Sequence, residues 1–144
     1  MSRRLARELA LKILYCYESG RSEIPAILNE ILDKKKYHFS MKAFSKKLVM
    51  LTIDNMGTID EQVKGVVQNW QYDRISTIDK LILRLGVCEL LFFNDIPYEV
   101  TINEAVEMAK KFGSEESQKF VNGILDAVAK QVKKTMRKNE GSNN

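Results

Sequence analysis

The side chains of this chain that could do chemistry are cations and aromatic rings rather than catalytic groups. His38 is the only histidine, so histidine-rich metal clusters and histidine-dependent catalytic triads find no support. The sequence has no Cys-x-x-Cys or His-Glu-x-x-His spacing, and its glycines form no phosphate-cradling loop. Glu115 and Glu116 could do acid–base work, but at the start of a helix they more simply complement the helix dipole. We therefore expect no catalytic residue, no metal site and no cofactor.

Basic residues are concentrated near the N-terminus, although the net charge of the chain is only +4. Arg3, Arg4, Arg7 and Lys12 are opposed there by Glu8 alone. Such a patch attracts phosphate backbones through counterion release, and the planar fork of arginine can hydrogen-bond twice to one phosphate. A second basic cluster near the C-terminus could equally be a solubilising tail; it comprises Lys130, Lys133, Lys134, Arg137 and Lys138. Nucleic acid therefore leads the list of expected partners.

Tyr15 continues the basic stripe, because it follows Arg7 by eight residues, or about two helical turns. Aromatic faces beside cationic grooves stack on unpaired bases. We expect the arginines of this stripe to lie on the side of the helix away from Leu5, Leu9 and Ile13. The helical pattern alone leaves a second interpretation of Tyr15 open, in which its ring is half-buried in the core.

The elements that must position these residues are helices throughout, because no alternating strand pattern persists along the chain. We expect seven, at about 2–18, 23–35, 41–56, 58–70, 77–92, 101–112 and 115–134. Capping boxes at Thr58-x-x-Glu61 and Thr101-x-x-Glu104 should start two of them, and Ser76 should cap the fifth. Gly20, Gly57 and Gly113 should end three others. The sequence thus predicts an all-α fold of two fused small bundles, about 1–57 and 58–136, with a frayed tail over 137–144.

Length and hydrophobic content allow this fold a core of its own. The chain has 144 residues, 44% of them hydrophobic, which suffices without metal or disulfide staples. The fifth helix is apolar nearly all round, so we expect it at the centre. Cys16 and Cys88 lie within apolar helical patterns, and we interpret them as reduced core thiols rather than a disulfide. With no signal peptide and no membrane-length apolar run, we expect a cytoplasmic protein.

Two segments resemble one known family closely. Residues 70–126 contain the ordered motifs DRIS.ID..ILRL and DIPY.V.INEA.E.AKKFG.E.S.KFVNG.LD, and residues 3–15 read RRLARELALKILY. This pattern is similar to that of the NusB family of bacterial transcription antitermination factors. The resemblance covers about half of the chain, and its second half is the more specific.

The resemblance implies an RNA-binding protein. Family members bind the boxA element of nascent ribosomal RNA through the arginine-rich first helix and a tyrosine at the place of Tyr15. Leu5 stands inside the basic run, where another arginine can occur. A second RNA element would be formed by Glu116, Lys119 and Phe120, although Phe120 could also be a core residue.

The resemblance also implies protein partners. The family acts with NusE, a ribosomal protein of the small subunit, and joins RNA polymerase and other Nus factors. We expect Asp79, Lys80 and Arg84 to contribute a partner-binding surface for NusE. Monomer and homodimer both remain open. Two alternatives stand beside this interpretation: a non-catalytic helical adaptor without a specific RNA role, and the NusB-like domain of a ribosomal RNA methyltransferase, for whose cofactor domain 144 residues leave no room.

Overall fold

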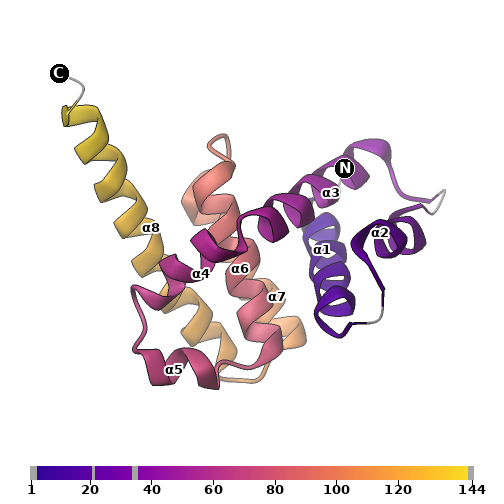
Figure 1. The fold of residues 1–144 in the computed structure, drawn as a ribbon, viewed down its shortest axis with the longest axis horizontal. Helices are drawn as coiled ribbons and strands as arrows, with labels where there is room; N and C mark the ends of the chain where they lie inside the picture. The colour runs from indigo at the N-terminus through magenta and orange to yellow at the C-terminus, as the bar shows by residue number, and fades with distance from the viewer. Residues whose placement is uncertain (1–2, 21, 34–35, 143–144) are drawn as a thin grey trace.

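The fold is all-α, as the sequence predicts. The computed structural model describes residues 3–20, 22–33 and 36–142, and across these ranges it contains helices and no strand. Figure 1 shows the helices in chain order. They are α1 (Arg3–Glu18), α2 (Ile24–Leu32), α3 (Phe39–Asp54), α4 (Met56–Lys64), α5 (Asn69–Arg74), α6 (Thr77–Phe92), α7 (Tyr98–Phe112) and α8 (Ser117–Ser142).

Helix α6 forms the centre of the molecule. It packs against α1, α3, α4, α7 and α8, and every residue from Leu81 to Glu89 is buried. The prediction of a helix covered nearly all round is therefore confirmed. Gly86 lets α6 approach α8 closely, because a Cβ there would lie 2.7 Å from a methyl carbon of Leu125 on α8.

One continuous core joins the two ends of the fold. Helices α1, α2 and α3 lie together at one end of the molecule, and helices α4 to α8 form the other end (Figure 1). The division near residue 57 stays a prediction. The backbone of α8 is helical as far as Ser142, and the frayed tail expected over 137–144 stays a prediction. No helix-breaking residue interrupts the last part of α8 before Gly141, and residues 143–144 lie outside the described part of the chain.

Several helix ends follow from local sequence chemistry. Gly20 follows the end of α1 with a φ of 71°, a conformation that glycine adopts without strain. The Ser76 hydroxyl accepts a hydrogen bond from the backbone N–H of Asp79 at 3.2 Å and so caps α6. Helix α7 ends at Phe112, directly before Gly113. These three expected boundaries are confirmed.

The two predicted capping boxes are wrong. Helix α4 starts at Met56, so Gly57 and Thr58 lie in its first turn instead of marking a boundary. It ends at Lys64, with Gly65 as its C-cap. A separate helix α5 begins after Gln68, whose backbone N–H donates to the Gln71 side chain at 3.4 Å. Helix α7 begins after Pro97, so Thr101 is already inside it. One expected helix is therefore two, and the described residues form eight.

Candidate nucleic-acid interface

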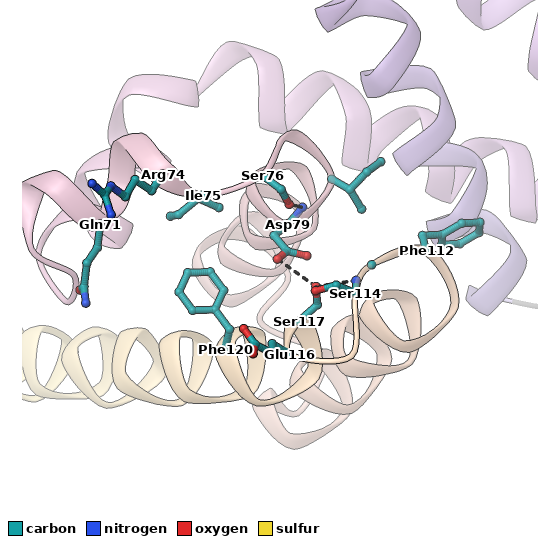
Figure 2. Close-up of a pocket in the computed structure, with 12 residues that line it drawn as sticks. Gln71, Arg74, Ile75, Ser76, Asp79, Phe112, Ser114, Glu116, Ser117 and Phe120 are labelled. Atoms are coloured by element: carbon teal, nitrogen blue, oxygen red, sulfur yellow. Dashed lines mark hydrogen bonds between the residues drawn. The ribbon is translucent and has the colours of Figure 1, made fainter.

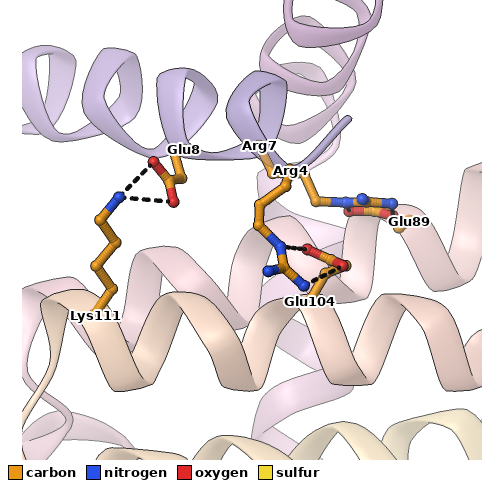
Figure 3. Close-up of polar contacts among 6 residues, drawn as sticks. All are labelled: Arg4, Arg7, Glu8, Glu89, Glu104 and Lys111. Carbon is orange, nitrogen blue, oxygen red and sulfur yellow. Dashed lines mark hydrogen bonds and ion pairs between the residues drawn. The ribbon is translucent and has the colours of Figure 1, made fainter. Parts of the chain in front are cut away.

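Arg7 is buried, so the expectation that it lies on the exposed basic stripe is wrong. Its side chain is 3% exposed and forms two hydrogen bonds to the Glu89 carboxylate of α6, at 2.7 and 2.8 Å (Figure 3). The Thr101 hydroxyl of α7 donates to the same carboxylate at 3.2 Å. Arg7 turns toward α6 because a buried carboxylate requires a cation and hydrogen bonds to offset its desolvation. Its guanidinium is therefore committed to the interior.

Two further ion pairs tie α1 to α7. Arg4 donates from Nε and Nη2 to the Glu104 carboxylate at 3.0 and 3.1 Å, and Lys111 donates to both oxygens of Glu8 at 3.0 and 3.1 Å (Figure 3). The Arg4 and Lys111 side chains stay more than half exposed. Exposed pairs of this kind contribute little to stability and can exchange their partner for a phosphate. Arg4 thus remains accessible at the surface.

The other residues of the predicted stripe, Arg3, Lys12 and Tyr15, do not share one environment. The Arg3 guanidinium lies against α3, 4.9 Å from the centre of the Phe44 ring. Lys12 is exposed, and the described residues offer it no ion-pair partner. Tyr15 is 47% exposed, which favours the surface interpretation over the core interpretation. Lys12 and Tyr15 thus form the accessible end of the stripe.

Lys12 and Tyr15 line an apolar hollow that leads toward α8. This hollow, about 290 Å³ in volume, is lined by Leu5, Glu8, Leu9, Leu11, Lys12, Tyr15, Ile78 and Phe112. A second hollow of about 510 Å³ shares Ile78 and Phe112 with the first. Its remaining lining residues are Gln71, Arg74, Ile75, Ser76, Asp79, Gly113, Ser114, Glu116, Ser117 and Phe120 (Figure 2). We call the two hollows together the Tyr15–Phe120 groove.

The structure brings part of each predicted RNA element to this groove: Lys12 and Tyr15 from the first, Glu116 and Phe120 from the second. Glu116, directly before α8, and Lys119, in its first turn, are both exposed. Lys119, like Lys12, has no ion-pair partner among the described residues. Phe120 is half-buried and packs against the core, yet it lines the groove (Figure 2). The core therefore holds one part of the Phe120 ring while another part faces the groove, and its contact with RNA stays a prediction.

Phe112 and Arg74 are groove residues that the sequence analysis missed. Phe112 is 43% exposed and belongs to both hollows. Arg74, at the end of α5, adds a cation to the wall near Phe120. A large aromatic residue directly before a helix-ending glycine was an available signal for Phe112. Arg74 could not be found, because only the packing of α5 places it beside α8.

Asp79 supports the groove from below instead of presenting its charge to a partner. Its side chain is 9% exposed and accepts a hydrogen bond from the Ser117 hydroxyl at 2.9 Å (Figure 2). The Ser117 hydroxyl in turn accepts the backbone N–H of Ser114 at 3.0 Å. Asp79 therefore fixes the turn between α7 and α8, and its expected surface position is wrong.

Arg84 is also buried, at 8% exposure, so its expected surface position is wrong. It donates to both carboxylate oxygens of Asp60 on α4, at 2.9 and 3.1 Å, and lies 3.8 Å from Glu18. Tyr72 packs beside this pair, and its pKa is raised, chiefly by desolvation. Lys80 is half-buried with its ammonium 4.5 Å from the centre of the Tyr72 ring. These residues tie α4 and α5 to α6.

The remaining polar chemistry of the described residues is sparse. Cys16 and Cys88 are both free thiols, as expected. Within residues 3–20, 22–33 and 36–142, no three metal-ligating side chains come together in a cluster. No described helix combines the length and the apolar character that a membrane span requires.

One family model and the relatives described below each match most of this chain. The model of the NusB family matches residues 4–130. The transcription antitermination protein NusB of a Nitratiruptor species is 42% identical over 137 residues, which cover 95% of this chain and 98% of that protein. The NusB of Geobacter sulfurreducens is 43% identical over 129 residues, covering 89% of this chain and 94% of that protein.

Solved structures agree with the sequence comparison. The structure of T. maritima NusB superposes with a TM-score of 0.84 at 40% identity, covering 90% of this chain and 92% of that chain. A chain from a complex of the antitermination factors NusB and NusE with double-stranded RNA superposes with a TM-score of 0.79 at 28% identity. That match covers 91% of this chain and 99% of the other.

Proposed function

This chain belongs to the NusB family, and we propose that it is a transcription antitermination factor that binds single-stranded boxA RNA together with NusE. The complex would join RNA polymerase and the other Nus factors on nascent ribosomal RNA, which places the protein in the cytoplasm. We propose no reaction for it. It would act by binding RNA and NusE, which suits a surface of cations and aromatic rings.

The Tyr15–Phe120 groove is the observation that carries this proposal. It places two aromatic residues that lie 105 positions apart in the sequence on one surface, with Phe112 between them. Aromatic faces along a groove accept successive unpaired bases, and each stacked base contributes about 1–3 kcal/mol. A paired duplex buries its base faces in its own stack, so the groove favours a single strand.

The charges beside the groove suit a phosphate backbone. Lys12 and Arg74 line the groove, and Lys12 has no ion-pair partner among the described residues. Lys119 is exposed three positions after the lining residue Glu116, and Arg4 is exposed on α1. Glu116 would repel phosphate, so we assign it to hydrogen bonds from base edges. Arg3 stays in the proposed interface as a peripheral cation, whereas Arg7 acts through the fold.

A shared surface with NusE follows from the modest size of this charge patch. Few cations line the groove, and a joint surface with a second protein would supply more contacts to RNA than this chain alone. Lys80 stays in the proposed partner surface, and the solved complex of NusB and NusE with RNA supports such a pairing. Asp79 and Arg84 would shape that surface from beneath because both are buried.

Fluorescence anisotropy with a labelled boxA single strand tests the proposal. We expect this RNA to bind more tightly than a scrambled strand, and added NusE to strengthen binding further. Because the solved complex contains double-stranded RNA, a boxA duplex serves as the competitor and should compete poorly. Lys46→Ala, which removes an exposed lysine of α3, serves as the control variant. Absence of RNA binding both with and without NusE would leave only the adaptor interpretation.

A further inference from the structure

A second groove lies at the other end of the molecule, between α2 and α3. It has a volume of about 690 Å³ and shares no lining residue with the Tyr15–Phe120 groove. Helices α2 and α3 both pack on α1 more closely than on each other (Figure 1). The groove lies between these two helices. Its lining residues are Ile24, Pro25, Leu28, Asn29, Leu32, Asp33, Phe39, Lys42, Ala43, Lys46 and Met50.

The lining of this groove is mainly apolar, and one large ring is left in water. Phe39 is 82% exposed at the start of α3, more than any other large hydrophobic side chain among the described residues. Leu28 and Met50 are only partly buried in the same furrow. A contiguous apolar surface with polar residues at its edge is typical of a site that another molecule covers.

The charge on the α3 wall indicates what that molecule carries. Lys42 and Lys46 lie one helical turn apart, and the described residues give neither of them an ion pair. Asp33 is the single carboxylate in the lining. A partner that places two carboxylates one turn apart would pair with both lysines while its apolar side chains cover Phe39 and Leu28.

The architecture of the groove favours a helix as the occupant. Both walls are helices that satisfy their own backbone groups, so an extended strand would find no free edge to pair with. Ile24 to Leu32 rises about 13 Å along the axis of α2, which accommodates roughly two to three turns of a docked helix. We propose that the α2–α3 groove binds an acidic amphipathic helix of a protein partner, and that it does so independently of RNA.

A designed peptide pair tests this proposal. The probe is a labelled peptide of about 18 residues with leucines at helical spacing (i, i+3, i+4, i+7) and glutamates one turn apart beside them. Its twin carries lysines in place of the glutamates. Anisotropy titration with the full chain should show at least about tenfold tighter binding of the acidic peptide. Backbone amide shifts on binding should fall within residues 24–33 and 39–50.

Two variants connect the binding to the groove. Lys42→Glu with Lys46→Glu should abolish the preference for the acidic peptide and favour the basic twin. Lys130→Glu with Lys134→Glu, which changes an equally spaced pair on α8, should leave the preference intact. Phe39→Ser should weaken both peptides by about tenfold. If the charge reversal disturbs folding, Lys42→Gln with Lys46→Gln replaces it and should remove the preference without inverting it.

The proposal fails if the two peptides bind equally, if neither binds, or if the preference survives the charge reversal. It also fails if the amide shifts fall along the Tyr15–Phe120 groove. Saturating the protein with boxA RNA should leave the affinity for the acidic peptide unchanged. Competition between RNA and peptide would show that the peptide occupies the RNA site and would overturn the α2–α3 assignment. If the protein binds the acidic peptide but no boxA RNA, the proposed function fails and the α2–α3 assignment stands.

Discussion

The guanidinium of Arg7 and the carboxylate of Glu89 lie against each other in the core, joined by hydrogen bonds of 2.7 and 2.8 Å. Arg7 comes from α1 and Glu89 from α6, while Thr101 of α7 donates a third hydrogen bond to the same carboxylate. This one contact therefore holds three helices together. It also places Tyr15 and Lys12, on the same helix as Arg7, at a fixed position relative to Phe112 on α7.

Removing one partner of this buried pair should destabilise the protein strongly. Arg7→Leu leaves the Glu89 carboxylate buried without its cation, and we expect a loss of about 3–5 kcal/mol in the free energy of unfolding, measured with urea. The double variant Arg7→Leu with Glu89→Leu should recover a large part of that loss, because it leaves no unpaired charge. A weakened affinity for RNA at unchanged stability would instead place Arg7 in the RNA interface.

Tyr15 should contribute to RNA binding through its ring. Tyr15→Ala should weaken binding of the boxA strand by about 1–3 kcal/mol, whereas Tyr15→Phe should weaken it much less because the aromatic face remains. Anisotropy titrations measure both affinities, and thermal unfolding provides the control for folding. If both variants bind RNA normally but unfold more easily, the ring serves the fold alone.

Lys12, the lysine that lines the groove, should contribute to the salt dependence of RNA binding. For single strands the logarithm of affinity falls with the logarithm of salt concentration by about 0.7 for each neutralised phosphate. Lys12→Ala should therefore reduce the slope by up to about 0.7. Lys46→Ala, which changes a lysine of the separate α2–α3 groove, should leave the slope unchanged. Equal slopes for the parent and both variants would exclude Lys12 from the phosphate contacts.

The hydrogen bond between Asp79 and Ser117 should support the RNA surface without touching RNA. Ser117→Ala leaves the buried Asp79 oxygen without its donor and should reduce stability by about 1–3 kcal/mol. Because Ser117 also holds the turn before α8, the affinity for RNA should fall as well. Asp79→Asn, which keeps an acceptor oxygen, should retain most of the RNA affinity. If Asp79→Asn lost as much RNA affinity as Ser117→Ala, the carboxylate itself would contact RNA.

Alkaline pH should destabilise the fold through Cys88. Burial raises the pKa of this thiol from 9.0 to about 11. Between these values the unfolded chain has released the proton while the folded chain still holds it, so stability should fall as pH rises through this window. Urea unfolding from about pH 8 to about pH 10.5 should show a steeper decline for the parent protein than for Cys88→Ala. The raised pKa of Tyr72 also lowers stability at alkaline pH, but it does so in both proteins. The difference in stability between parent and Cys88→Ala therefore reports on Cys88.

The sequence by itself determined the helical class, the central helix and the family. Apolar residues at helical spacing, together with Gly20, Ser76 and Gly113, define most of the helices, because these signals act within a few residues of the chain. It also identified Tyr15 and Phe120 as candidate base-binding residues. The break between α4 and α5 was missed, since the apolar pattern of Val66 and Val67 continues beyond Lys64, where α4 ends.

Only the tertiary structure decided which charged residues face solvent. Arg4 and Arg7 are three positions apart on one helix, yet Arg7 meets the buried carboxylate of Glu89 while Arg4 stays in water. Spacing along a helix fixes the direction of a side chain but not what lies there. In the same way, Tyr15 and Phe120 share a groove only because α1, α6, α7 and α8 pack around Ile78 and Phe112. Contacts between residues so distant in the chain are set by packing and by the pairing of buried charge, which no local pattern contains.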